Sequence, residues 1–319
     1  MGKKLLLVFI HGFRGSDTSF KDFPDWLESS LGQTLPGTEV ETIIYPRYNT
    51  AGELSVAVQN FSSWLLAQKS RHNEDVDVVL LGHSMGGIVG AETILQFHEQ
   101  GTALSILGLL AYDTPFYSIN EGFISRTASS WVQKLDRFLP SMSTSINSGA
   151  AIANHLQITA PPTTTSASSS FLQWGLVGSA MGIATLGAYL TRDRILTMMT
   201  STFDHLEFVS ALADQDGCHQ RMTALLSVSD LIVRCFYVKV KSSNISNTFI
   251  TMPPNDTMHV FTPIVTTAES EIAAHISIFD PYKNDHYYTL GSDSIALIST
   301  MVARRRSCTL HDPCITPAI

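Results

Sequence analysis

Short apolar runs alternate with segments of helical periodicity in the first third of the chain. Nearly continuous apolar runs predict buried strands at residues 4–10, 76–81 and 105–112, and residues 38–45 are predicted as a further strand. Three segments between them carry apolar side chains at helical spacing and predict helices: residues 22–31, 53–69 and 88–98. Buried strands that alternate with helices are typical of a parallel sheet covered on both faces. The pattern therefore predicts the α/β class.

The alternation resumes in the last third of the chain. Strands are predicted at residues 231–241 and 247–252, and helices at 220–226, 269–276 and about 288–304. We assign residues 1–117 and 228–305 to one core domain and 306–319 to a tail. Residues 118–227 interrupt the pattern, and we expect them to form an inserted cap.

A Gly-x-Ser-x-Gly motif follows the third predicted strand, in Gly82-His83-Ser84-Met85-Gly86-Gly87. A strand before this motif and a helix after it are the setting of a nucleophile elbow, a tight turn that exposes a serine hydroxyl. Side chains at positions 82 and 86 would collide with the neighbouring strand and helix, which explains the two glycines. The alternative is a strand–helix turn without catalytic role. The flanking pattern favours Ser84 as a nucleophile, and we expect the side chain of His83 to point elsewhere.

Two loops offer backbone N–H groups that could bind an oxyanion. The N–H of Met85 lies at the predicted start of a helix, where negative charge is stabilised. The first strand ends in His11-Gly12-Phe13-Arg14-Gly15-Ser16, and a His-Gly loop at this place forms the other half of the oxyanion hole in α/β-hydrolases. The N–H of Phe13 is therefore the second candidate donor, and His11 is expected to shape the loop. The alternative is a glycine turn that only connects strand and helix.

A serine nucleophile needs a histidine base, which in turn is oriented by an acid. Asp113 ends the strand that follows the elbow strand, and the carboxyl ends of parallel strands meet at one edge of the sheet. Asp113 could therefore reach a histidine beside Ser84, or it could only cap the turn that follows it. The base is expected in the loop after the last strand. His275 and His286 both fall there, and position alone does not separate them.

Composition narrows the classes of partner. The chain has 319 residues, of which 44% are hydrophobic, enough for one large domain with an insertion. Its formal net charge is -8, and the cluster Arg304-Arg305-Arg306 is its main basic run, which argues against a nucleic-acid partner. The four cysteines do not suggest a disulfide framework. Cys308, His311 and Cys314 lack an evident fourth ligand, so we expect no metal site.

The N-terminus combines Lys3 and Lys4 with an apolar run, which superficially resembles a signal peptide. A small-residue cleavage site is missing, and the core needs this run as a strand. We therefore expect no cleavable signal peptide and an intracellular protein, either cytoplasmic or peripherally associated with a membrane.

The predicted insertion contains two unusual segments. Residues 141–170 are rich in Ser, Thr, Ala and Pro and indicate a flexible linker. Residues 171–190 carry no charge and are long enough to cross a membrane. A single crossing would separate Ser84 and Asp113 from the histidine region, so no catalytic core could form. We therefore expect a helix that packs on the core or lies at a membrane surface as part of the cap.

Four blocks of the sequence resemble one known family: HGFRGS, LLGHSMGG, LAYDTPF and AAHISIFDPYKNDHYYTLG. Together they resemble the serine esterase/lipase family of α/β-hydrolases, particularly its fungal members, over residues 4–116 and more loosely over 203–300. In the related fungal sequences the last block has a histidine, a Met/Phe-type pair, an Asn and a Tyr pair, which favours His275 over His286. Lipases of the pancreatic type carry their acid after the strand that follows the elbow strand. This similarity favours Asp113, as does the lack of a carboxylate after residues 231–241.

The residues and the resemblance together predict an α/β-hydrolase fold, with a mostly parallel central sheet flanked by helices and a helical cap and linker insertion. The predicted activity is hydrolysis of carboxylic esters, of lipid or other apolar acyl groups, by Ser84, His275 and Asp113. The expected partners are an ester substrate and a membrane surface that contacts residues 171–190, without metal or organic cofactor. A thioesterase or amidase is one alternative, and a catalytically silent scaffold associated with membranes is another.

Overall fold

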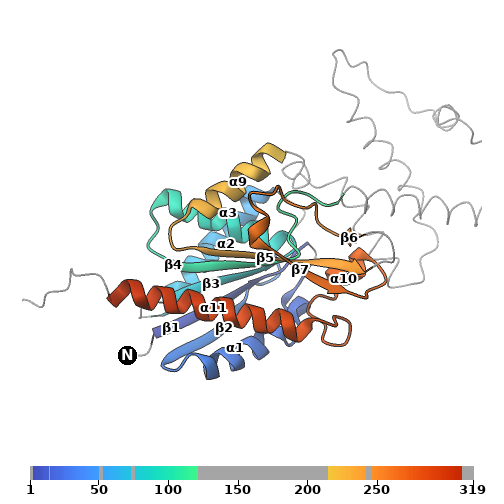
Figure 1. The fold of residues 1–319 in the computed structure, drawn as a ribbon. Coiled ribbons are helices and arrows are strands. Elements are labelled where there is room, and N and C mark those ends of the chain that lie inside the picture. Colours follow the sequence, from blue (N-terminus) through green and yellow to red (C-terminus); the bar gives the residue numbers. More distant parts are fainter. Residues whose placement is uncertain are drawn as a thin grey trace, which may run out of the picture. The chain divides into compact units, whose positions relative to one another are not determined.

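A mostly parallel β-sheet lies at the centre of the computed structural model, with helices on both of its faces (Figure 1). The structure describes residues 3–13, 15–49, 53–72, 76–120, 215–241 and 246–310. The chain divides into two units, Met1–Asn120 with Leu206–Ile319, and Glu121–His205. The second unit lies outside the described residues, as do the predicted linker at 141–170 and the apolar segment at 171–190. The extent and the fold of the insertion therefore stay predictions.

Seven strands form the sheet within the described residues. They are β1 (Lys3–Ile10), β2 (Thr38–Ile44), β3 (Val76–His83), β4 (Ser105–Tyr112), β5 (Ile232–Lys241), β6 (Ser246–Thr248) and β7 (Phe261–Thr266). The order is β2-β1-β3-β4-β5, and β7 lies parallel to β5 along its other edge. The chain reverses its direction of travel across the sheet between β1 and β3. Ligands bind at such a switch point in open α/β sheets, at the carboxyl ends of the strands.

Helices cover the two faces unequally. Those of the first part of the chain are the 3-10 helix η1 (Asp17–Phe20), α1 (Phe23–Thr34), α2 (Leu54–Lys69) and α3 (Met85–Gln100). Those of the last part are α9 (Gln215–Ser227), the 3-10 helix η2 (Met258–Val260), α10 (Glu271–Ile276) and α11 (Tyr287–Leu310). Helices α1 and α11 pack on one face, and α2, α3 and α9 pack on the other (Figure 1). The predicted α/β class, with helices on both faces of a mostly parallel sheet, is confirmed.

Three elements in the last part of the chain differ from the sequence-based expectation. The strand predicted at residues 247–252 is the shorter β6, which ends at Thr248. Strand β7 was not predicted, because it is only six residues long and Pro263 interrupts it. A proline is tolerated here because, within the part of the chain that the structure describes, β7 is an edge strand that pairs with β5 alone. Helix α11 extends beyond the predicted end at Arg304 to Leu310, since no glycine or proline follows before Pro313. Among the described residues, no helix is both long and apolar enough to cross a membrane.

An aromatic cluster joins the sheet to the segment after α10. The ring centroid of Phe279 lies 5.0 Å from those of Phe20 and Phe23, and 5.1 Å from that of Tyr112. All four side chains are fully buried. Removing a buried Phe ring typically costs about 3–5 kcal/mol, so this cluster fixes the segment that carries His275 against the sheet.

The short strand β6 brings a further aromatic ring to the carboxyl edge. Residues Lys239–Lys241 of β5 pair antiparallel with β6, beyond the point where the pairing of β5 with β4 ends. Because β7 occupies the opposite edge of β5, β6 lies on the β4 side. Phe249 directly follows β6 and therefore stands near the end of β4, where Asp113 is found.

Candidate active site

Ser84 occupies a strained turn between β3 and α3. Its φ is 54° and its ψ is -127°, a backbone conformation that residues with a side chain rarely adopt. The N–H of Ser84 donates to the carbonyl oxygen of Tyr112 at 2.9 Å, and the N–H of Gly87 donates to the carbonyl oxygen of Ser84 at 3.1 Å. The turn is therefore held both by the neighbouring strand and by the helix that it starts.

Two glycines of the motif allow this turn to approach its neighbours. A Cβ atom on Gly86 would lie 2.1 Å from the carbonyl oxygen of Ile10. A Cβ atom on Gly82 would lie 2.4 Å from the Cα of Gly87. Both contacts are with backbone atoms, which cannot move aside as a flexible side chain could. The glycines are therefore required by close packing of β1, β3 and α3.

The loop after β1 lies directly against Ser84. A Cβ atom on Gly12 would come within 2.7 Å of the Cβ and 3.2 Å of the Oγ of Ser84. The structure thus brings the Gly12-Phe13 segment and the Ser84-Met85 segment together, as the prediction of two oxyanion donors requires. Met85 is the first residue of α3, so its N–H lies at the positive end of the helix dipole.

His11 supports this loop from within the protein. Its side chain is fully buried, and its Nδ1 lies 3.0 Å from the carbonyl oxygen of Gly12, to which it donates. The ring stacks on Tyr48 at 4.8 Å, and the Tyr48 hydroxyl donates to the His11 carbonyl oxygen at 2.9 Å. Burial lowers the pKa of His11, so the ring is neutral at pH 7. Its contacts are those of a residue that shapes the loop.

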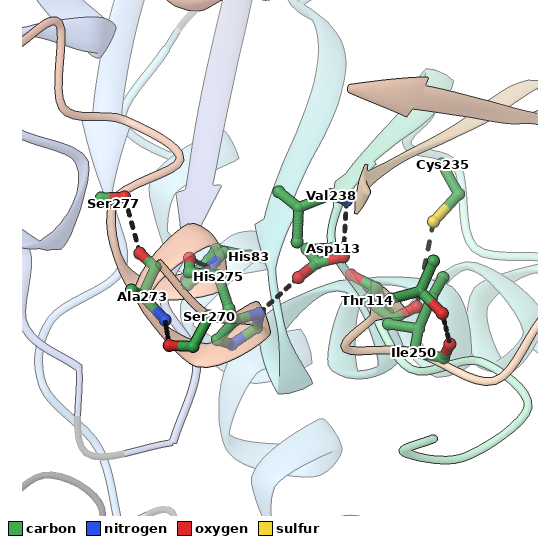
Figure 2. A network of polar contacts seen from close by, with 11 residues as sticks. His83, Asp113, Thr114, Cys235, Val238, Ile250, Ser270, Ala273, His275 and Ser277 are labelled. Carbon is green, nitrogen blue, oxygen red and sulfur yellow. Dashed lines mark hydrogen bonds and ion pairs between the residues drawn. The ribbon is translucent and has the colours of Figure 1, made fainter. Parts of the chain in front are cut away.

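Asp113 stands at the end of β4 with both carboxylate oxygens engaged. Its N–H donates to the carbonyl oxygen of Phe236 at 2.6 Å, and its φ is 48°. Oδ1 accepts the N–H of Val238 at 3.0 Å, and Oδ2 lies 2.7 Å from Nδ1 of His275 (Figure 2). The side chain is fully buried. A buried carboxylate is stable only when it is paired and hydrogen-bonded, and here it has both.

His275 lies in the short helix α10, which Ser270 caps by accepting the N–H of Ala273 at 3.2 Å. The His275 side chain is 3% exposed. Its ring stacks on that of Phe249, with centroids 3.9 Å apart. Because the Asp113 carboxylate accepts at Nδ1, that nitrogen carries the proton and Nε2 is the free lone pair of the neutral ring.

The two candidate histidines differ in their burial and in their hydrogen bonds. His275 is buried and hydrogen-bonded to Asp113, whereas His286 is exposed just ahead of α11. The contacts of His286 are through its backbone: its N–H donates to Asn284 Oδ1 at 3.0 Å, and its carbonyl oxygen accepts the N–H of Leu290 at 2.8 Å. Asp113 is therefore paired with His275 and not with His286.

One residue at this edge was not expected to contribute. The ring of His83 lies 4.7 Å from that of His275, and its Nε2 lies 3.1 Å from the His275 carbonyl oxygen (Figure 2). Burial, and secondarily the neighbouring His275, hold the pKa of His83 well below its usual range. This contact could not be predicted from sequence, because 192 residues separate the two partners.

Other polar features lie outside this cluster. Among the described residues, no group of three or more His, Cys, Asp or Glu side chains is arranged to hold a metal ion. A pocket of about 280 Å³, lined in part by Phe97, Ser105 and Met301, lies at the amino-terminal end of β4. That end is opposite to Asp113, so the pocket is separate from the candidate active site.

A strained serine between a strand and a helix, at the carboxyl edge of a mostly parallel sheet flanked by helices, defines the α/β-hydrolase fold. A scan with protein-family models finds no match to the chain, and no curated protein matches its sequence. The predicted relationship to fungal members of the serine esterase/lipase family therefore stays a prediction.

Several solved structures of this fold are distantly similar. The gene lin2722 product of Listeria innocua is 11% identical over 87% of this chain and 89% of its own, with a TM-score of 0.43. A carboxylesterase structure from the thaumarchaeon Nitrososphaera gargenis is 10% identical over 95% of this chain and 92% of its own, with a TM-score of 0.39. The RedJ thioesterase of Streptomyces coelicolor is 16% identical over 49% of this chain and 58% of its own, with a TM-score of 0.28. The chain thus spans less than two thirds of RedJ, and these similarities are too remote to assign an activity.

Proposed function

We propose that this protein is a serine hydrolase that cleaves carboxylic esters, with Ser84 as nucleophile, His275 as base and Asp113 as the acid that orients His275. The observation that carries the proposal is the buried 2.7 Å hydrogen bond between His275 Nδ1 and Asp113 Oδ2. This pair occurs at the same edge of the sheet as the strained Ser84 turn, whose N–H is bonded to Tyr112, the residue before Asp113.

The proton on His275 Nδ1 determines the chemistry. With Nδ1–H donated to Asp113, the lone pair on Nε2 can take the hydroxyl proton of Ser84 as Oγ attacks the ester carbonyl. The resulting imidazolium is stabilised by the Asp113 carboxylate. It then gives its proton to the departing alcohol, which leaves an acyl group on Ser84. Water, deprotonated in the same way by His275, releases the carboxylic acid and restores the serine.

The negative charge of the tetrahedral intermediate needs donors that are already in place. We assign this role to the N–H groups of Phe13 and Met85. The close approach of Gly12 to Ser84 Oγ and the position of Met85 at the start of α3 support the assignment. Loss of one such donor typically costs about 3 kcal/mol of transition-state stabilisation.

The preference for lipid or other apolar acyl groups has a different basis. It rests on the uncharged segment at residues 171–190, whose composition favours contact with a membrane surface, and on the resemblance to the esterase/lipase family. The same three residues would also cleave thioesters or amides, so the acyl preference and the bond type are tested separately.

A fluorophosphonate probe tests the reaction class, because it forms a covalent bond only with an activated serine. We expect the full-length wild type to be labelled on Ser84, and the label to be lost in Ser84→Ala. The variant Ser227→Ala, at the exposed end of α9, is the matched control and should be labelled as the wild type is. A folded wild type that neither takes the label nor hydrolyses p-nitrophenyl esters would favour the silent scaffold.

A series of p-nitrophenyl esters from acetyl to palmitoyl tests the acyl preference. We expect kcat/KM to rise with acyl length, and a sharp optimum at acetyl would contradict the lipid assignment. Matched acyl thioesters and anilides, assayed with the same preparation, separate an esterase from a thioesterase and an amidase.

A further inference from the structure

His83 links the nucleophile turn to the proposed base through a specific hydrogen bond. Its Nε2 lies 3.1 Å from the carbonyl oxygen of His275 (Figure 2). A carbonyl oxygen can only accept, so Nε2 of His83 carries the proton and donates. His83, which directly precedes Ser84 in the chain, therefore contacts the backbone of His275, and Asp113 binds the side chain of His275.

The two contacts on His275 are complementary. Asp113 binds the ring through Nδ1 and makes no contact with the backbone of His275, while the Phe279 cluster anchors the segment that follows α10. That helix is only six residues long, Glu271–Ile276, so its own hydrogen bonds provide little rigidity. The bond from His83 fixes the carbonyl at the end of this helix, and the two rings lie 4.7 Å apart at an interplanar angle of 31°.

We propose that His83 is a positioning residue for the reaction: its Nε2–H holds the His275 backbone so that the imidazole keeps the orientation set by its bond to Asp113. The proposal rests on the function proposed above. His83 does not touch the substrate in this scheme, and it acts only through His275.

The surroundings of His83 suit an uncharged ring in this role. Burial disfavours its charged form, so it adds no positive charge beside a histidine that becomes an imidazolium during turnover. The ring of Phe279, 5.5 Å away and nearly perpendicular, holds His83 within the aromatic cluster. A lysine or arginine could also donate to the carbonyl, but it would bring a charge into this buried place.

Two substitutions separate the donor from the ring. His83→Phe keeps an aromatic ring of similar size but removes the N–H. His83→Gln removes the ring but can place an amide N–H near the position of Nε2. Loss of precise alignment typically costs about 10²-fold in rate, so we expect His83→Phe to lower kcat about 10- to 100-fold with KM changed less than about threefold. His83→Gln should recover most of the loss.

The assay is ester hydrolysis by the full-length protein, with thermal unfolding recorded for each variant. Wild-type kcat in His83→Phe would overturn the proposal, and so would an equal loss in both variants, because the donor would then not matter. Recovery by His83→Gln alone would support it.

A second measurement does not depend on activity. The His275 Nδ1–H bonded to a buried carboxylate is expected as a far-downfield proton resonance, identified by its loss in His275→Gln. It should weaken or shift in His83→Phe and persist in His83→Gln, and an unchanged resonance in His83→Phe would contradict the positioning role. An inactive and unlabelled wild type would contradict the proposed function, while this resonance would still decide whether His83 holds His275.

Discussion

Replacing Asp113 by asparagine tests the proposed mechanism at its most specific point. The substitution conserves shape and changes only which atoms accept and which donate. In the structure Oδ1 accepts the N–H of Val238 at 3.0 Å, and Oδ2 accepts Nδ1–H of His275 at 2.7 Å. An amide has one oxygen and one NH₂ group, so it can satisfy only one of these two donors.

The position of the amide follows from the Val238 contact. If the NH₂ group faced Val238, two donors would meet and a buried N–H would lose its partner, at a cost of about 1–3 kcal/mol. The oxygen therefore stays with Val238 and the NH₂ group faces His275. His275 must then accept at Nδ1, which moves its proton to Nε2, where the ring can no longer take the proton from Ser84. The corresponding change in other Ser-His-Asp enzymes lowers kcat about 10⁴-fold, or about 5.4 kcal/mol of transition-state stabilisation.

We therefore expect kcat/KM of Asp113→Asn on a p-nitrophenyl ester to fall by about 10³- to 10⁴-fold, with fluorophosphonate labelling slowed in parallel. Asp77→Asn is the matched control, because Asp77 lies at the other end of β3, bonded to Ser105 and paired with Arg305. Thermal unfolding should show that both variants are folded. Activity of Asp113→Asn within about tenfold of the wild type would refute the reasoning, since it would mean that Asp113 does not set the His275 tautomer.

Two further changes test the packing around the site. Gly12→Ala would place a Cβ 2.7 Å from that of Ser84 and displace the serine; since overpacking typically costs about 1–3 kcal/mol, kcat/KM should fall by roughly 5- to 150-fold. Gly32→Ala in α1, where a Cβ would meet nothing within 4 Å, should leave activity unchanged, and equal effects of the two would contradict this account. Lys21→Met removes the ion pair with Asp280. Burial raises the pKa of the Asp280 carboxyl, but the hydrogen bond from Lys21 and further contacts outweigh this effect, so the pKa is lowered overall. A carboxyl group whose pKa is lowered in the folded state stabilises the protein at pH values above its unfolded pKa of about 3.9. This stabilisation is lost as the pH falls through the folded pKa. Urea unfolding should thus show the variant less stable by at most about 1 kcal/mol at pH 7, because Lys21 is half exposed, and the difference should shrink as the pH falls through the lowered pKa of Asp280; a constant difference would exclude this pair as its source.

The strands that are buried on both faces could be predicted from sequence, as could the edge strand β2, whereas the edge strand β7 could not. Runs such as residues 105–112 are almost wholly apolar because helices cover both sides of the sheet, so their pattern indicates a central parallel strand. β7 has a neighbour on one side only, and its exposed positions and Pro263 remove that signal. The turn at Ser84 could be predicted because close packing requires glycines at fixed positions around the serine. These glycines are visible in the sequence as the Gly-x-Ser-x-Gly motif.

No comparable pattern in the sequence indicates the contacts that surround His275. His83, Asp113 and Phe249 reach it from separate parts of the chain, and each is an unremarkable residue type in its own local sequence. The choice of His275 over His286 therefore depended on the resemblance to a family and not on spacing. Exposure separates them physically, since a base that must hold one tautomer needs a buried partner, and His286 is exposed.

The backbone of the sheet explains why two of the three proposed catalytic residues are held differently from the third. The hydrogen bond from Ser84 N–H to Tyr112 and that from Asp113 N–H to Phe236 continue the ladders of β3–β4 and β4–β5 past the ends of the strands. Ser84 and Asp113 are thus placed by strand register, which an apolar pattern and a turn motif specify. His275 has no ladder bond to the sheet and is held by Asp113, His83 and stacking on Phe249. Its geometry should therefore be the most sensitive to substitution at a distance, and loss of a side chain that touches only His275 should change catalysis more than it changes the stability of the sheet.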